Sequence, residues 1–203
     1  MVNPSNCIGC EACVKHCKQE AISFQYNDWG EGSIYVDPTL CNNCNLCQKI
    51  CPSLNHEFNP EQENVYAVIS TQHRYTGSSG GVFYELATRF IQNGGVVFGS
   101  AFNDELKLEH RKVTSTDELL PLCKSKYLRS SMSNTYSEIL SALQNNQKIM
   151  FVGTPCQVTA VKNLFSKKYR NQLFFFVIFE HFLSPYYKFS TCLWIAAEPS
   201  AFV

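Results

Sequence analysis

Apolar and polar residues alternate in two short stretches near the N-terminus, at residues 21–25 and 33–36. This period of two predicts a pair of strands joined by the turn-forming residues 27–30, as in a hairpin. Farther on, residues 55–64 are polar, contain Pro60 and three acidic side chains, and follow no period. We therefore expect two domains, at residues 1–57 and 58–203.

In the second domain, short apolar strands alternate with amphipathic helices. Strands are predicted at residues 65–69, 96–98, 106–110, 148–152 and 173–179. Helical spacing of apolar positions predicts helices that begin at Val82, Thr135 and Pro155, and a capping-box pattern predicts a short helix at residues 115–118. In the helix that Thr135 is expected to cap, the core face is predicted to be Tyr136, Ile139, Leu140 and Leu143. The alternation of strands and helices is typical of an α/β domain.

Charge and hydropathy narrow the functional classes. Lys plus Arg and Asp plus Glu both number 17 in the 203 residues, so no global field favours nucleic acid or an anionic membrane. The longest apolar stretches, residues 173–179 and 193–197, are far shorter than the roughly 20 residues that cross a bilayer. We expect no membrane span, no nucleic-acid partner, and a cytoplasmic location, because no signal-peptide pattern precedes the first cysteine.

Eight of the 11 cysteines form two runs of identical spacing. The first run is Cys7, Cys10, Cys13 and Cys17, and the second run is Cys41, Cys44, Cys47 and Cys51. Each cysteine of the first run recurs 34 residues later, which indicates an internal duplication.

Three thiolates at intervals of three residues, on a loop that curls around one point, can occupy three corners of a 4Fe-4S cubane. In the bacterial two-cluster arrangement the other run supplies the fourth corner. The spacing therefore predicts that the first three cysteines of each run share a cluster with the last cysteine of the other run. One set is Cys7, Cys10, Cys13 and Cys51, and the other set is Cys41, Cys44, Cys47 and Cys17. The segment resembles a bacterial-type two-cluster ferredoxin domain, although Lys18 stands where that pattern has proline.

Two other uses of the cysteines fit the sequence less well. Structural zinc prefers two separated cysteine pairs that close a tetrahedron, and two closely spaced runs of four fit that pattern poorly. A disulfide framework requires an oxidising compartment, which nothing in the sequence indicates.

Three loops of the second domain carry candidate binding chemistry. Residues 78–81, Ser-Ser-Gly-Gly, open a predicted helix and suit a phosphate, or else form an ordinary capped turn. Lys126 lies in a loop that is either a phosphate contact or a solvated turn. Thr154 suits a helix N-cap, with Gln157 completing the capping box and Cys156 in the first turn. Cys156 is then a candidate catalytic thiol, or a small buried side chain.

Together with the cysteine runs, these loops are similar to the β-subunit family of coenzyme F420 hydrogenases and dehydrogenases, in its bacterial form with an N-terminal ferredoxin domain. The matching stretches are residues 78–83, 94–99, 125–127 and 153–157. The resemblance implies an α+β chain in which a small two-cluster ferredoxin-like domain precedes a flavin-binding α/β domain. The cofactor-binding residues that it implies are Ser78, Ser79, Gly80, Gly81, Lys126, Thr154, Pro155, Cys156 and Gln157.

The implied activity is that of an iron–sulfur flavoprotein oxidoreductase with two 4Fe-4S clusters and FAD. Ferredoxin or another redox subunit would donate electrons, and coenzyme F420 or another two-electron acceptor would exchange them with the flavin. The alternative function is a non-catalytic electron-transfer module that serves a partner oxidoreductase. The family continues with a Cys-His-Gly stretch where this chain has residues 180–182, Glu-His-Phe, so we expect its α/β domain to be incomplete.

Overall fold

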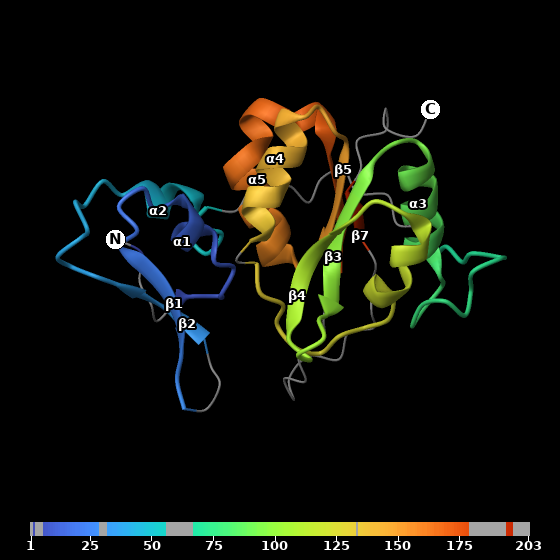
Figure 1. Ribbon diagram of the computed structural model, residues 1–203, viewed down its shortest axis with the longest axis horizontal. Coiled ribbons are helices and arrows are strands. Elements are labelled where there is room, and N and C mark those ends of the chain that lie inside the picture. The colour runs from blue at the N-terminus through green and yellow to red at the C-terminus, as the bar shows by residue number, and fades with distance from the viewer. Residues whose placement is uncertain are drawn as a thin grey trace.

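The computed structural model describes residues 2, 6–28, 32–55, 67–132, 134–178 and 194–196. These residues form a mixed α+β fold of two parts, an N-terminal cysteine-rich segment and a following α/β region (Figure 1). In Figure 1 the cysteine-rich segment lies on one side of helices α4 and α5, and the central sheet lies on their other side. No helix among these residues combines the length and the apolar character that crossing a bilayer requires.

The backbone of the cysteine-rich segment repeats itself as the sequence does. Helix α1 (Ala12–His16) and helix α2 (Leu46–Ile50) begin 34 residues apart and have the same length. Left-handed backbone angles recur at matching loop positions, with φ of 69° at Gly9 and 56° at Asn43. The residue before each helix is also left-handed, with φ of 60° at Glu11 and 58° at Asn45. These turns curl both cysteine loops in the same way, which confirms the duplication.

The predicted hairpin is present between the two cysteine loops. Strand β1 (Ile22–Tyr26) pairs antiparallel with strand β2 (Gly32–Val36), and Ile22 lies opposite Val36. The side chains of Ile22 and Ile34 are buried toward the cysteine loops. The hairpin therefore closes one side of the cysteine-rich segment.

The α/β region is built on a five-stranded sheet in the order β4-β3-β5-β6-β7. The three inner strands, β3 (Val96–Phe102), β5 (Ile149–Gly153) and β6 (Leu173–Val177), are parallel to one another. The edge strands β4 (Leu108–Val113) and β7 (Trp194–Ala196) pair antiparallel with their neighbours. The inner strands are rich in Val, Ile and Phe, as expected for strands that are covered on both faces.

Helices cover both faces of this sheet. Helix α3 (Val82–Gln92) packs on one face, together with the short 3₁₀ helices η3 (Thr116–Glu118) and η4 (Leu120–Leu122). Helices α4 (Thr135–Gln144) and α5 (Pro155–Tyr169) pack on the other face, and the 3₁₀ helix η5 (Arg170–Gln172) follows α5. The chain thus has a layered α/β region, as the pattern predicts.

One continuous hydrophobic core joins the two parts of the molecule. It contains Ala12 and Ile50 from the cysteine-rich segment, Ile139 of α4, Val161 of α5 and Phe151 in the sheet. The cysteine-rich segment is therefore packed against the α4 and α5 layer rather than merely tethered to it.

Several predicted element boundaries are wrong in detail. Residues 67–69 are not a strand, while residues 65 and 66 of that prediction lie outside the described residues. The strand predicted at residues 106–110 instead begins at Leu108, because Leu106 is in a left-handed turn with φ of 58°. Thr135 does not cap α4, since the N-cap is Asn134 and the Thr135 hydroxyl donates to the His110 carbonyl.

The predicted core face of α4 is also wrong at one position. Tyr136, Ile139 and Leu143 are almost completely buried, but Leu140 is 37% exposed. The helical spacing of four residues from Tyr136 to Leu140 does not guarantee burial, because α4 covers the sheet with only one narrow side.

Ile139 and Leu140, which are neighbours in α4, give a matched test of the core. We expect Ile139→Ala to lower the free energy of unfolding by about 2–5 kcal/mol, because Ile139 is fully buried and its loss leaves a cavity. Leu140→Ala should cost about 1 kcal/mol or less. Anaerobic urea unfolding of both variants would measure the difference, and equal losses would contradict this account of the core.

Candidate metal centre

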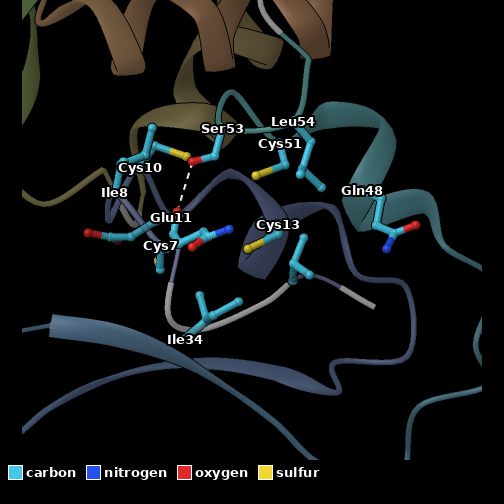
Figure 2. A pocket seen from close by; sticks show the side chains of 12 residues that line it. Cys7, Ile8, Cys10, Glu11, Cys13, Ile34, Gln48, Cys51, Ser53 and Leu54 are labelled. Atoms are coloured by element: carbon cyan, nitrogen blue, oxygen red, sulfur yellow. Dashed lines mark hydrogen bonds between the residues drawn. The ribbon is translucent and has the colours of Figure 1, made fainter.

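Four cysteines from both runs surround one cavity. Cys7, Cys10, Cys13 and Cys51 line a space of about 280 Å³, together with apolar neighbours such as Ile34. Figure 2 shows the side chains of Cys10, Cys13 and Cys51 directed toward one another around this space. A single water needs only about 10–15 Å³ of such volume, so the cavity has room for a polyatomic group. The fourth cysteine comes from the second run, as the crossed arrangement predicts.

Burial governs the acidity of the thiols in this first cavity. Burial, as the largest cause, and the neighbouring cysteines together raise the pKa of Cys10 and of Cys13 to about 12. Both groups are therefore protonated thiols at neutral pH until a metal replaces the proton, since thiolate is the form that ligates. The Gly9 N–H donates to Cys7 Sγ over 3.4 Å, which is the kind of backbone contact that stabilises a cluster sulfur.

The other four cysteines of the two runs form the second set. Cys17, Cys41, Cys44 and Cys47 line a hollow of about 30 Å³ between the two loops. By the same measure this hollow has room for about two water molecules, which is much less than the first cavity offers. Cys44 is exposed, which sets this loop apart from the buried first loop.

The arrangement does not suit the two alternative uses of cysteine. The ten described cysteines are free thiols, so no disulfide joins them. Among the described residues, no group of three or more His, Cys, Asp or Glu side chains is arranged to hold a single metal ion. Four cysteines spread around a larger space fit a polynuclear cluster better than a single tetrahedral zinc, whose sulfur ligands lie about 2.3 Å from the metal.

Residues of the α/β region hold the first cysteine loop in place. The Tyr136 hydroxyl donates to the Cys10 carbonyl over 2.5 Å, and both residues are buried. The Glu11 carboxylate accepts hydrogen bonds from the Met132 N–H and the Ser131 hydroxyl, at 3.4 and 3.3 Å. Burial raises the pKa of Glu11, and these hydrogen bonds partly offset that effect. The loop therefore has partners for its buried polar groups outside its own segment.

Helix α5 fastens the second loop in a similar way. The Asn163 amide donates to the carbonyls of Ile50 and Asn55, at 3.1 and 3.0 Å. Sequence patterns did not identify Tyr136, Glu11 or Asn163 as contacts of the cysteine loops. Of these three residues only Tyr136 carried a signal in the sequence. It was predicted to lie in the core, and a buried phenol hydroxyl needs a hydrogen-bond partner.

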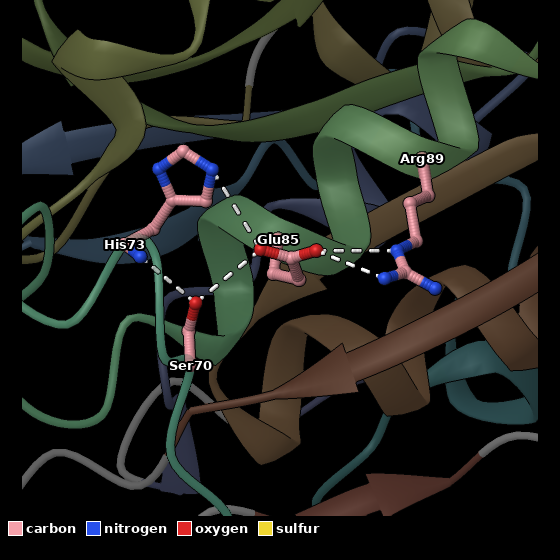
Figure 3. A network of polar contacts seen from close by, with 4 residues as sticks. All are labelled: Ser70, His73, Glu85 and Arg89. Carbon is pink, nitrogen blue, oxygen red and sulfur yellow. Dashed lines mark hydrogen bonds and ion pairs between the residues drawn. The ribbon is translucent and has the colours of Figure 1, made fainter.

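The predicted anion loop, Ser78, Ser79, Gly80 and Gly81, lies at the start of α3, with Gly81 as the N-cap. Gly81 has φ of 71°, and a β-carbon there would overlap the His73 carbonyl, so packing within the chain already requires this glycine. The preceding loop is held to α3 by the network that Figure 3 shows. In it Glu85 accepts hydrogen bonds from Ser70 and Arg89 and lies 3.7 Å from the His73 ring.

The loop with Lys126 reaches the anion loop. The Ser125 N–H donates to Ser78 Oγ over 2.8 Å, which brings two of the predicted stretches together. Lys126 itself is half-buried, and its amine donates to the carbonyls of Cys123 and Lys124, at 2.8 and 3.2 Å. Burial lowers the pKa of Lys126. The cation thus stabilises its own loop in this structure.

The third predicted stretch forms the capped turn that the sequence indicates. Thr154 is the N-cap of α5, Pro155 is the first helical residue, and Gln157 Oε1 accepts from the Thr154 N–H over 3.0 Å. The Gln157 amide also donates to Ser130 Oγ over 3.0 Å, so this turn is joined to the loop that follows Lys126. Cys156 is half-buried, with its Sγ 3.1 Å from Thr154 Oγ1, and lies close enough to Cys10 to interact with it electrostatically.

His110 proves to be a core histidine. Its Nε2 lies 2.9 Å from the Val152 carbonyl, its Nδ1 lies 2.9 Å from Ser130 Oγ, and its ring stacks on Phe151. Burial lowers the pKa of His110 to about 4. The neutral ring therefore links the edge strand β4 to β5 and to the loop at Ser130.

Comparison with known proteins agrees with this centre. Residues 6–55 match the family described as 4Fe-4S dicluster domain. The chain is 37% identical over 67 residues to a ferredoxin from Alicyclobacillus acidocaldarius, which covers 30% of this chain and 80% of the relative. The chain therefore belongs, through its N-terminal segment, to the ferredoxin family with a 4Fe-4S dicluster domain.

Two more similarities cover a smaller share of the matched protein. An uncharacterized ferredoxin-like protein from Haemophilus influenzae is 37% identical over 57 residues, which are 25% of this chain, and the chain spans 60% of its length. A chain of the F420-reducing [NiFe] hydrogenase complex from Methanosarcina barkeri aligns with a TM-score of 0.44 and 16% identity, over 53% of this chain and 40% of that one. That structural similarity is too low to carry an argument.

Crossed ligation can be tested by pairing variants. If Cys51 completes the first set, Cys7→Ala and Cys51→Ala should remove or alter the same cluster, while Cys17→Ala and Cys41→Ala should affect the other. Iron content and EPR spectra of the reduced variants would show which pairs match. Cys123→Ala is the control, because Cys123 is buried outside both cavities and donates to the Leu119 carbonyl. A match between Cys51→Ala and Cys41→Ala would contradict crossing.

Proposed function

We propose that this chain is an iron–sulfur flavoprotein oxidoreductase of the coenzyme F420 hydrogenase and dehydrogenase β-subunit type. Its reaction is the passage of electrons between two 4Fe-4S clusters and FAD, to or from coenzyme F420 or another two-electron acceptor. The observation that carries the proposal is the position of the first cysteine cavity. Its loop is packed through Tyr136 and Met132 against the α/β region, which is the region proposed to hold the flavin.

In this proposal the eight cysteines of the two runs are the cluster ligands, in the crossed sets described above. The domain limits are those that the sequence predicts, residues 1–57 for the ferredoxin part and 58–203 for the flavin part. When bound, the clusters supply one-electron steps, and the flavin joins them to two-electron chemistry.

The proposed flavin site is the edge of the sheet where the inner parallel strands end. Helix α3 leads by a short turn into β3, and α5 follows β5, so both helix N-termini face this edge. Ligands of α/β proteins bind outside the carboxyl ends of parallel strands, and helix N-termini attract phosphate. The contacts that link Ser78 to Ser125 and Gln157 to Ser130 support one continuous rim along this edge.

Eight of the nine predicted residues have a proposed role within this rim, and Gln157 caps the helix that begins there. Ser78, Ser79, Gly80 and Gly81 would offer backbone N–H groups to the pyrophosphate, and Thr154 and Pro155 would place the start of α5 beside it. Lys126 would exchange its present carbonyl partners for a phosphate oxygen. Cys156 is the proposed catalytic or redox thiol, since it belongs to this rim and interacts electrostatically with Cys10.

A second candidate is a non-catalytic electron-transfer module that serves a partner oxidoreductase. The observation that favours it is that side chains predicted to bind flavin already make hydrogen bonds within the chain. Lys126 binds two carbonyls of its own loop, and the Gln157 side chain is buried among Thr154 and Ser130. In either case the proposed donor is ferredoxin or another redox subunit, and the proposed location is the cytoplasm.

Cofactor content separates the two candidates. We expect the anaerobically purified, reconstituted chain to contain about eight irons, about eight sulfides and about one FAD per polypeptide. Iron, acid-labile sulfide and released flavin would be measured on the same sample. About eight irons without flavin would reject the flavoprotein and leave the electron-transfer module, while zinc in place of iron would reject both.

The proposed phosphate contact has a matched control in the same loop. Lys126→Gln should lower the flavin content at least severalfold, because it removes the positive charge that is proposed to pair with pyrophosphate. Lys124→Gln removes the same charge from an exposed position two residues away and should leave flavin content unchanged. Equal flavin content in the two variants, at equal iron content, would exclude Lys126 from the site.

A further inference from the structure

Arg129 belongs to the α/β region but lies directly against the first cysteine loop. A β-carbon built on Gly9, which stands between Cys7 and Cys10, would overlap the guanidinium of Arg129. A β-carbon on Gly32 of the hairpin would overlap it as well. The absence of side chains at these two glycines therefore makes the space that the guanidinium occupies.

The guanidinium is held there by contacts with the hairpin. Arg129 Nη1 donates to the Gly32 carbonyl over 3.4 Å. Its central carbon lies 4.5 Å from the centre of the Phe24 ring and 5.8 Å from that of Tyr26, within the range of cation–π attraction. A planar guanidinium suits such stacking better than the point charge of an ammonium. The cation is thus held beside the cysteine loop by contacts on more than one side.

The charges that face the cysteine loop are few. Arg129 interacts electrostatically with the buried Glu11 carboxylate, which lies next to Cys10 in sequence. Glu11 is also the one charged side chain that lines the first cavity among the described residues. The positive charge of Arg129 therefore adds to the hydrogen bonds from Met132 and Ser131 that stabilise this buried carboxylate.

We infer that Arg129 is a positioning residue of the first cluster, one that holds the cysteine loop and raises the reduction potential of that cluster. Reduction adds one electron to the cluster and so makes it more negative, and a nearby fixed cation favours the more negative state. Net charge and hydrogen bonding around the sulfurs are established determinants of cluster potential. The inference rests on the proposed ligand set of Cys7, Cys10, Cys13 and Cys51 but not on the flavin.

The test is a potentiometric titration of the reconstituted full chain followed by EPR, with Arg129→Gln and Arg129→Lys. We expect Arg129→Gln to lower the equilibrium constant for reduction of the first cluster about threefold to tenfold. A tenfold decrease corresponds to a reduction potential about 59 mV more negative for one electron. Arg129→Lys keeps the charge. The reduction potential of the first cluster in this variant should therefore stay close to that of the unchanged chain, even where the loss of stacking on Phe24 lowers stability. A merely structural role would change stability in both variants and leave the potential unmoved.

Two controls assign the effect to one cluster. Lys18 lines the second cavity, so Lys18→Gln makes the same charge change there and should shift the other potential. Lys107→Gln lies in an exposed ion pair with Glu105 and should shift neither. The inference is overturned if Arg129→Gln leaves both potentials unchanged, or if it shifts the same potential as Lys18→Gln. Iron content of each sample separates these outcomes from failure of the cluster assignment, which would appear as a chain without iron.

Discussion

Burial of the first cysteine loop against helices α4 and α5 is the constraint on which the rest of this structure depends. A buried loop brings its carbonyls, N–H groups and charges out of water, and each of them then needs a partner. The Cys10 carbonyl has Tyr136, the Glu11 carboxylate has Met132 and Ser131, and the guanidinium of Arg129 fills the space beside Gly9. These partners all come from the α/β region, so the cysteine-rich segment and the sheet form one packed unit.

The two cysteine loops show how one local structure can be placed in two environments. They share spacing, helix length and left-handed backbone positions, and yet Cys10 and Cys13 are buried while Cys44 is exposed. Solvent exposure and hydrogen bonding alter the properties of a metal centre even when its ligands are the same. The duplication therefore supplies two similar cysteine loops, and their position against the α/β region makes them different.

The α/β region organises its loops around internal hydrogen bonds. Ser130 lies at a junction, where His110 and Gln157 both contact its hydroxyl, and Gln157 also caps α5. Such satisfied networks fix the backbone of a loop more firmly than an exposed turn does. The edge of the sheet is accordingly ordered by the chain's own residues, and a ligand bound there would meet N–H groups that are already in place.

The sequence by itself determined the features that depend on neighbours along the chain. The cysteine spacing indicated the duplication, and Thr154, Pro155 and Gln157 indicated the capped start of α5, because turns and caps are made within a few residues. The crossed ligand sets stay a prediction. The exposure of Leu140, the hydrogen bond of Thr135 to His110, and the contacts of Tyr136 and Arg129 with the cysteine loop were decided by the tertiary structure alone. The contacts of Thr135, Tyr136 and Arg129 each join residues far apart in the chain, and a local pattern carries no information about which distant surface a side chain will meet.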